Sequence, residues 1–221
     1  VIVGGGPTGV EMAGAIAEIA HKTLFKNFKK ISPEKSKIYL IEGFDRVLPG
    51  FPKKLSDYAG KTLKKMGVTV MTSQMVSDIT EQGVHVGDQF LESHNIIWAA
   101  GNEGSPLLKT LNTPLDKQGR AMVEKDLSLP KHPEIFVIGD TACVIRNNNP
   151  LPGVAPVAIQ QGCYVGKMIR KGGPLKKRRP FKYFDKGGLA TIGEHKAVGY
   201  FNDNTQQEEE SDYFENKSNK R

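Results

Sequence analysis

A glycine-rich run near the start of the chain has the spacing of a phosphate-binding loop. The run contains the pattern Gly-x-Gly-x-x-Gly and stands between the apolar residues 1–3 and a helical stretch. In such a loop Gly4 permits a tight turn, Gly6 lets the backbone approach a pyrophosphate, and Gly9 allows close helix–strand packing. The sequence therefore predicts dinucleotide binding, with a purely structural turn as the alternative. The expected cofactor-binding residues are Gly4, Gly5, Gly6, Pro7, Thr8 and Gly9.

Two carboxylates near this loop are candidates for contacts with a nicotinamide dinucleotide. Glu42 ends a second apolar run, where it can accept both ribose hydroxyls and repel a 2′-phosphate, which favours NADH over NADPH. Glu11 follows the third glycine by two residues, and the helix dipole favours a negative charge there. Its functional interpretation is a carboxylate near the reacting nicotinamide ring. The alternatives are a surface residue at a strand end for Glu42 and a helix-start preference for Glu11.

The elements around these residues predict an α/β fold. Apolar runs at 1–3, 38–42, 68–71 and 96–100 are typical of buried strands, and helical periodicity occupies 10–20 and 53–66. Short β-type runs between 75 and 91 indicate an antiparallel meander. The first hundred residues thus predict a Rossmann-like domain with a parallel sheet and a β-meander.

The remainder of the chain is less regular. Residues 105–134 have little periodicity and suggest an inter-domain passage, and 135–140 predict a buried strand that ends at Gly139 and Asp140. Pro156 opens a helix that continues to Ile169. Strand-like runs recur at 182–184, 189–192 and 197–201. The last twenty residues have no apolar period, and we expect them to form a disordered acidic tail.

Composition excludes several classes of protein. The 221 residues carry two cysteines, Cys143 and Cys163, which are too few for a disulfide scaffold and are not in a Cys-x-x-Cys pair, so both are expected to be packed thiols. The five histidines lack metal-ligand spacing, and we expect no metal site. The sequence contains no stretch of 18 consecutive apolar residues, so we expect no membrane-spanning helix.

The net charge of +7 is concentrated in one stretch. Residues 167–186 carry nine basic side chains and one acidic side chain. Such a stretch could face an anionic membrane, and a solvated loop is the alternative. Because no RNA-binding, zinc-finger or recognition-helix pattern accompanies it, we expect no nucleic-acid partner.

Five motifs in order give the chain a resemblance to a known family. The motifs are Val1–Gly14, Trp98–Gly101, His132–Asp140, Ala155–Gly162 and Tyr183–Gly193. With these motifs the chain resembles the type II NADH dehydrogenases, the non-proton-pumping NADH:quinone oxidoreductases of bacterial and mitochondrial membranes.

The resemblance implies an FAD-dependent enzyme that transfers a hydride from NADH to FAD and then electrons to a membrane quinone. It implies catalytic roles for Glu11 and Lys186, the latter as a cation that stabilises a flavin or quinone anion. Gln160 and Gln161 would border the quinone. The further cofactor-binding residues it implies are Ala99, Ala100, Gly101, Gly139, Asp140, Ala155 and Pro156.

On this resemblance, residues 1–104 form the NADH-binding domain and 105–201 the C-terminal portion of an FAD- and quinone-binding domain, followed by the tail at 202–221. We expect the chain to be a fragment that lacks the N-terminal half of the FAD domain. The intact protein would lie peripherally on the cytoplasmic face of a bacterial inner membrane, or on the mitochondrial inner membrane, and a homodimer is left open. Two alternatives remain: another two-dinucleotide reductase of the ferredoxin or nitrite type, and a non-catalytic NADH-binding module.

Overall fold

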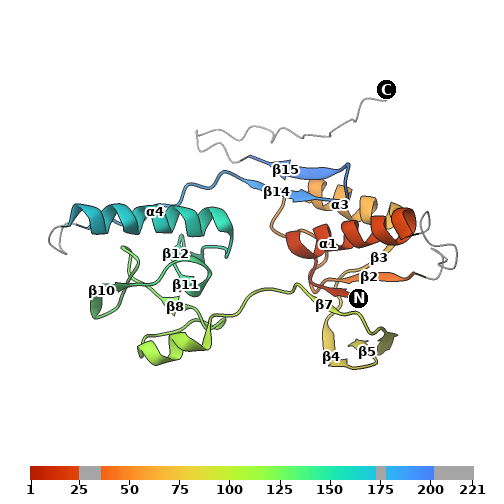
Figure 1. Ribbon diagram of the computed structural model, residues 1–221, viewed down its shortest axis with the longest axis horizontal. Coiled ribbons are helices and arrows are strands. Elements are labelled where there is room, and N and C mark those ends of the chain that lie inside the picture. Colours follow the sequence, from red (N-terminus) through yellow and green to blue (C-terminus); the bar gives the residue numbers. More distant parts are fainter. Residues whose placement is uncertain (25–35, 173–177, 202–221) are drawn as a thin grey trace. The chain divides into compact units, whose positions relative to one another are not determined.

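The computed structural model describes residues 1–24, 36–172 and 178–201, which form two compact units (Figure 1). The first unit contains Val1–Gly101 and the chain from Lys186 onward, and the second contains Asn102–Asp185. The acidic tail and Lys176 and Lys177 of the basic stretch lie outside the described residues.

The first unit is built on a parallel sheet, as the sequence predicts, and the strand order in the structure is β3-β2-β1-β7. In β1, Ile2 pairs with Leu40 on one side and with Ile97 on the other. Because the strands on its two sides come from different parts of the chain, the turn after β1 lies at the switch point where α/β sheets bind ligands. The strands are β1 (Ile2–Val3), β2 (Ile38–Ile41), β3 (Val68–Met71) and β7 (Ile97–Trp98).

Two helices cover this sheet because each carries an apolar stripe. α1 (Pro7–Glu18) begins at a proline, continues into a π-helical turn at Ile19–Thr23, and is followed in sequence by β2. α3 (Lys53–Lys65) connects β2 to β3. The stripes have a spacing of three or four residues, and their members are buried together with the sheet in one core. They include Val10, Ala13 and Ala17 of α1 and Leu55, Ala59 and Leu63 of α3.

The predicted meander is confirmed as a three-stranded antiparallel sheet. It consists of β4 (Val76–Thr80), β5 (Gly83–Val86) and β6 (Gln89–Glu92). Val84 and Val86 of β5 are buried with Ile41 in a small core of their own. This core fixes the meander to the carboxyl end of β2.

A β-hairpin from the end of the chain completes the first unit. β14 (Gly188–Thr191) and β15 (Ala197–Tyr200) pair antiparallel, and Ala190 and Val198 are buried in the same core as α1. The hairpin approaches α1 so closely that a Cβ on Gly14 would lie 2.6 Å from the backbone nitrogen of Gly193. The sequence grouped this hairpin with residues 105–201, whereas its apolar face packs on the first unit. The strand expected at 182–184 was wrong, because these residues have no regular secondary structure.

The second unit combines short strands with one long helix, α4 (Ala155–Lys171). The stretch 105–134, expected to be an inter-domain passage, instead supplies three of its five core residues, so that expectation was wrong. The core residues are Leu108, Ala121, Leu129, Val137 and Ala142. The short elements are η3 (Pro106–Leu111), β8 (Ala121–Met122), β9 (Ser128–Leu129), β10 (His132–Phe136), η4 (Gly139–Thr141), β11 (Ala142–Cys143), β12 (Ile145–Arg146) and β13 (Asn149–Pro150).

The buried strand predicted at 135–140 was wrong in both place and burial, because β10 overlaps it only at 135–136 and none of the residues of β10 is buried. β10 ends at Phe136, where it pairs with Ser128, because its antiparallel partner β9 is only two residues long. Val137 is buried, but Ile138 is 36% exposed. Gly139 then adopts a left-handed conformation with φ of 72° and begins a 3-10 turn. Gly139 and Asp140 therefore lie in a turn after the strand.

Candidate functional site

The three glycines of the loop after β1 have different surroundings. Gly4 has a φ of 105°, and a Cβ there would overlap the carbonyl group of Ala99. A Cβ on Gly9 would overlap the carbonyl oxygen of Gly4. A Cβ on Gly6, in contrast, would meet nothing within 4 Å. Gly4 and Gly9 thus allow the loop to fold, whereas Gly6 leaves open space that a phosphate can approach.

The first turn of α1 opens directly beside this space. Gly6 is the N-cap residue, and its carbonyl oxygen accepts the N–H of Val10 at 3.0 Å. Pro7 has no N–H, so the donors that remain at the helix start belong to Thr8 and Gly9. Such donors, together with the positive end of the helix dipole, form a site for an anion.

Glu42 lies next to the loop and is 7% exposed. Its Oε2 accepts the N–H of Gly5 at 2.5 Å, and its Oε1 accepts the N–H of Phe44 at 2.8 Å. Each carboxylate oxygen has two lone pairs, so both keep acceptor capacity for hydroxyl groups. The carboxylate therefore fixes the glycine loop to the end of β2, and its negative charge and remaining lone pairs are still available to a ligand.

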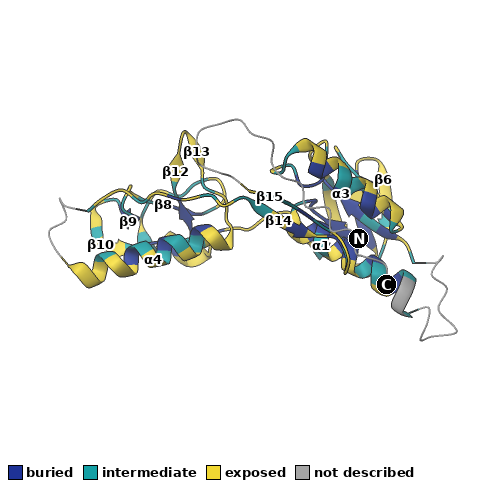
Figure 2. Ribbon diagram, turned by 90° about the horizontal axis from the view of Figure 1, so that it is seen from above, coloured by how far each residue is buried: buried dark blue, intermediate teal, exposed yellow. Residues whose placement is uncertain are grey.

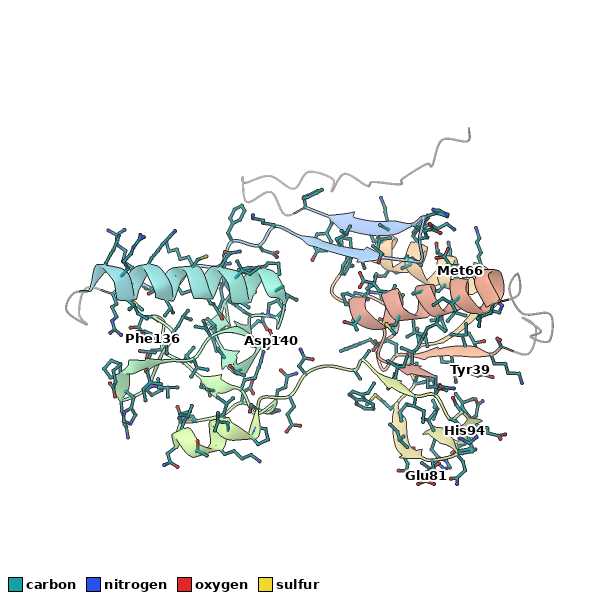
Figure 3. All side chains as sticks on the ribbon, viewed as in Figure 1. Tyr39, Met66, Glu81, His94, Phe136 and Asp140 are labelled. Carbon is teal, nitrogen blue, oxygen red and sulfur yellow. The ribbon has the colours of Figure 1, made fainter. Side chains whose placement is uncertain are left out.

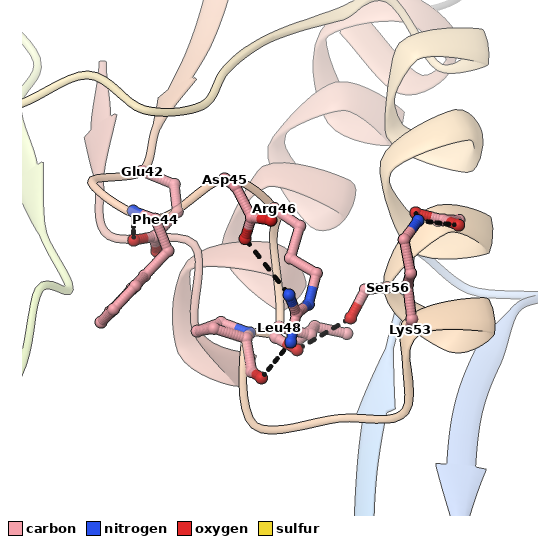
Figure 4. Close-up of polar contacts among 9 residues, drawn as sticks. Glu42, Phe44, Asp45, Arg46, Leu48, Lys53 and Ser56 are labelled. Carbon is pink, nitrogen blue, oxygen red and sulfur yellow. Dashed lines mark hydrogen bonds and ion pairs between the residues drawn. The ribbon is translucent and has the colours of Figure 1, made fainter.

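The segment after Glu42 is held by a network that sequence reasoning missed (Figure 4). The N–H of Leu48 donates to the carbonyl oxygen of Gly5 at 2.7 Å, and the Ser56 hydroxyl donates to the carbonyl oxygen of Leu48 at 2.9 Å. Leu48 has a φ of 49° and is fully buried. Arg46 donates to Asp45 and to the carbonyl oxygen of Pro49. No local periodicity marks these contacts, because they join three separate segments.

The return from β7 also borders the glycine loop. The N–H of Ala99 donates to the carbonyl oxygen of Val3 at 2.7 Å, which extends the ladder beyond the strand. Ala100 is exposed, and Gly101 has a φ of 111° with open space around its Cα. Trp98 is 59% exposed. The structure therefore brings the predicted residues Ala99 and Ala100 to the same edge of the sheet as Gly4.

Glu11 stands in the second turn of α1, one turn beyond the position at which the dipole acts most strongly. Its Oε1 accepts the N–H of Thr191 at 3.1 Å. Two turns further along, Oε2 of Glu18 accepts the N–H of Glu194 at 2.7 Å. Both carboxylates thus hold the β14–β15 hairpin on the helix.

In the second unit, the Gly139–Asp140 turn lies below the start of α4 (Figure 3). The Oε1 atom of Gln161 accepts the N–H of Gly139 at 2.6 Å, and Gln161 is only 1% exposed. Oδ2 of Asp140 accepts a bond from the Asn102 amide at 3.4 Å. Ala155 and Pro156 are exposed at the first turn of the helix. Gln161 therefore positions the turn that carries Asp140.

Gln160 makes a two-bond contact with the backbone before Lys186. Its Nε2 donates to the carbonyl oxygen of Phe184 at 2.8 Å, and its Oε1 accepts the N–H of Phe184 at 2.9 Å. The side-chain amide thus pairs with the Phe184 peptide as a neighbouring strand would. Lys186 itself is exposed and belongs to the first unit.

One residue of the basic stretch is part of the structure of the second unit. Arg178 pairs with Asp126 at 3.2 Å, donates to the carbonyl oxygen of Pro133 at 2.6 Å, and lies 5.0 Å from the centre of the Phe136 ring. Burial, the largest influence, raises the pKa of Asp126, but hydrogen bonds from Ser128 and Arg178 outweigh it and leave that pKa below its usual value. Arg178 is therefore not a free surface charge.

The two cysteines differ in exposure. Cys143 is buried, and burial followed by its interaction with Asp116 raises the pKa of its thiol. Cys163 on α4 is exposed, so the expectation that both thiols are packed was wrong for this residue. It is not part of the buried stripe of α4, which consists of Val157, Gln161 and Val165, and Figure 2 shows that this helix carries both buried and exposed residues.

The described residues hold no group of three or more metal-ligating side chains that could bind a metal ion. Within the same residues, no helix has the length and apolar character needed to cross a bilayer.

Comparison with known proteins gives the family. Residues 1–162 match the family described as pyridine nucleotide-disulphide oxidoreductase. The chain belongs to this family. The match covers the glycine loop, the meander and the Gly139–Asp140 turn, which confirms the predicted fold class.

Curated relatives confirm the resemblance drawn from the motifs. The type II NADH:quinone oxidoreductase Ndh of Mycobacterium tuberculosis is 40% identical over 209 residues, which cover 89% of this chain and 44% of that protein. The type II NADH:quinone oxidoreductase of Staphylococcus haemolyticus is 33% identical over 206 residues, covering 90% of this chain and 50% of that protein. The chain therefore spans about half the length of these relatives.

A solved structure shows the same fold. NDH2 from Plasmodium falciparum in complex with NADH matches with a TM-score of 0.79 at 21% identity, covering 90% of this chain and 56% of that one.

Proposed function

We propose that this chain contributes the NADH-binding domain and part of the flavin-binding domain of a type II NADH:quinone oxidoreductase. The observation that carries the proposal is the arrangement of open space at Gly6, the start of α1 and the buried Glu42 at one edge of the sheet. The names of the curated relatives support it.

The first unit would bind NADH. The pyrophosphate lies over Gly6, where the N–H groups of Thr8 and Gly9 point to it, and a ribose binds at the Glu42 carboxylate. The remaining lone pairs of Glu42 accept the ribose hydroxyls, and its negative charge repels the 2′-phosphate of NADPH. The nicotinamide half extends toward Ala99, Ala100 and Gly101, across the switch point between β1 and β7.

The residues for FAD and quinone lie in the second unit and at Lys186. The Gly139–Asp140 turn has a left-handed glycine, an exposed carboxylate and an adjoining helix start at Ala155 and Pro156, a donor and acceptor set that suits the polar chain of FAD. When bound, FAD accepts a hydride from NADH and passes electrons to a quinone. Gln161 orients the turn, Gln160 holds the segment before Lys186, and Lys186 supplies positive charge for a developing anion.

The proposed partner surface is the membrane in which a quinone is dissolved. The basic residues of 167–186 other than Arg178 would face anionic lipid, so the protein would bind peripherally, on the cytoplasmic face in a bacterium or on the mitochondrial inner membrane. A homodimer and the domain limits 1–104 and 105–201 belong to the same proposal, with the hairpin at 186–201 packed on the NADH unit.

The test is spectroscopic and enzymatic. The purified chain should bind NADH at least about tenfold more tightly than NADPH, because the Glu42 carboxylate opposes the additional phosphate. The intact protein should show a flavin absorbance spectrum and oxidise NADH with a soluble quinone. Absence of NADH binding to the chain would overturn the assignment of the first unit, and absence of flavin or of quinone reduction in the intact protein would overturn the rest.

A further inference from the structure

We propose that Phe44 and Met75 form the surface on which the adenine ring of the dinucleotide rests. The inference rests on the proposed binding of NADH and assigns residues to the base-binding end of that site. Phe44 is 64% exposed and Met75 is 72% exposed, although both are large apolar side chains.

The first argument is the order of groups along the site. One oxygen of the Glu42 carboxylate binds the N–H of Gly5, and the other binds the N–H of Phe44. Glu42 therefore stands between the phosphate loop and Phe44. A dinucleotide has the same order, because its ribose joins the phosphate to the base. With the ribose at Glu42, the base continues toward Phe44.

The second argument is that the backbone beneath the two side chains is rigid. The N–H of Ser73 donates to the carbonyl oxygen of Phe44 at 2.7 Å, and the N–H of Gln74 donates to the carbonyl oxygen of Glu42 at 3.0 Å. Ser73 adopts a left-handed conformation with a φ of 55°, which turns the chain after β3 toward this contact. These hydrogen bonds therefore hold the segments after β2 and β3 together at one edge of the sheet.

The third argument is the position of Met75 relative to Gly43. A Cβ on Gly43 would lie 2.6 Å from the Met75 sulfur, so the thioether rests directly over this glycine, next to Phe44 in sequence. In Figure 4 the Phe44 side chain extends away from Arg46 and Ser56, on the outside of the loop. An aromatic face and a polarisable thioether suit a flat heterocycle, because rings stack on aromatic side chains and sulfur contacts their edges favourably.

The experiment measures the affinity of the full chain for ADP-ribose, which carries the adenosine half and lacks nicotinamide. By calorimetry, Phe44→Ala should raise the Kd for ADP-ribose about tenfold, the size expected for the loss of one base–aromatic stack. Phe44→Tyr keeps the aromatic face and should remain within about twofold of wild type. Met75→Ala should weaken binding by a smaller factor of about three.

Phe90→Ala is the matched control, because Phe90 is also an exposed phenylalanine, on β6 of the meander, with 45% of its surface exposed. It should leave the Kd unchanged. Equal affinity of Phe44→Ala and wild type, or equal weakening by Phe90→Ala, would overturn the inference while leaving the proposed function intact. A wild-type chain that binds neither ADP-ribose nor NADH would overturn the proposed function as well.

Discussion

Glu11 on the nucleotide helix and Thr191 on the terminal hairpin are 180 residues apart in sequence, and the Glu11 carboxylate accepts the Thr191 N–H at 3.1 Å. The contact couples the helix that begins at the phosphate loop to the strand that follows Lys186. A residue expected to act on the nicotinamide ring thus also has a positioning role.

Substitution of Glu11 separates these two roles. Glu11→Ala removes the acceptor and should destabilise the protein by about 1 kcal/mol, which lowers the Tm by roughly 2–4 °C in a chain of this size. Glu11→Gln keeps a neutral acceptor and should leave the Tm almost unchanged. If the charge serves the reaction, Glu11→Gln will still lower NADH oxidation in the intact protein. Equal Tm values for Glu11→Ala and wild type would contradict the positioning role.

Gly6 and Gly9 should respond differently to the same substitution. Gly6→Ala meets open space, so the thermal stability should be retained, while NADH binding weakens about tenfold or more because the methyl group occupies the phosphate position. Gly9→Ala overlaps the carbonyl oxygen of Gly4 and should destabilise the first unit by several kcal/mol. Circular dichroism and calorimetry measure the two effects. Gly166→Ala, at another open position but on α4, is the control: it should leave NADH binding unchanged and should not lower the stability, because alanine favours a helix more than glycine does.

The buried amide of Gln161 should contribute to stability through the Gly139 N–H. Gln161→Leu leaves this donor without its acceptor and should cost about 1–3 kcal/mol in urea unfolding of the second unit. Gln160→Ala is the comparison, because Gln160 binds the Phe184 peptide at a more exposed site. A larger loss for Gln160→Ala than for Gln161→Leu would contradict the assignment.

Acid should weaken the second unit through Asp116. Burial raises the pKa of this carboxyl, but hydrogen bonds from Arg120 and Gln118 outweigh it and hold the pKa below its usual value. A lowered pKa in the folded state gives stability that is present above about pH 4, the unfolded value, and is lost as the pH falls through the folded value. Asp116→Asn should therefore lower the urea midpoint at pH 6 and have a smaller effect near pH 3. The exposed Asp88→Asn should lower the midpoint at neither pH.

The two thiols should react at different rates. Cys163 is exposed, whereas Cys143 is buried with a raised pKa, so little of Cys143 is thiolate at pH 8. A chromogenic disulfide reagent should titrate one thiol rapidly in the native protein and the second only after denaturation. Cys163→Ser should abolish the rapid phase. Persistence of a rapid phase in Cys163→Ser would contradict the burial of Cys143.

The sequence predicts the first unit well because its helices are periodic and its strands of the parallel sheet lie in apolar runs. β2, α3 and β3 lie within one residue of the predicted limits, and the meander follows the short runs between turn residues. The second unit is harder to predict, because strands of two residues such as β8 and β9 carry no period. The position of the hairpin on α1 depends on contacts between distant segments, which no local pattern encodes.

The candidate site shows the same division. The glycine loop follows from residue type and spacing, and Glu42 follows from its place at the end of the second apolar run. The roles of Leu48 and Ser56 in holding that loop depend on tertiary contacts, and so does the engagement of the Gln160 and Gln161 amides with backbone groups. A pattern of polar residues indicates which chemistry is possible. It does not reveal which of these side chains already form hydrogen bonds that hold the fold together.

The exposed Trp98 gives the first unit an optical probe of its own. It is the sole tryptophan of the chain and immediately precedes Ala99, whose carbonyl group abuts Gly4 of the phosphate loop. Indole emission overlaps the absorption band of reduced nicotinamide. NADH bound at this edge of the sheet should therefore quench the tryptophan fluorescence, and the fluorescence of the bound NADH should rise. Occupancy of the site can therefore be followed in real time, without a label, in every variant that keeps this indole.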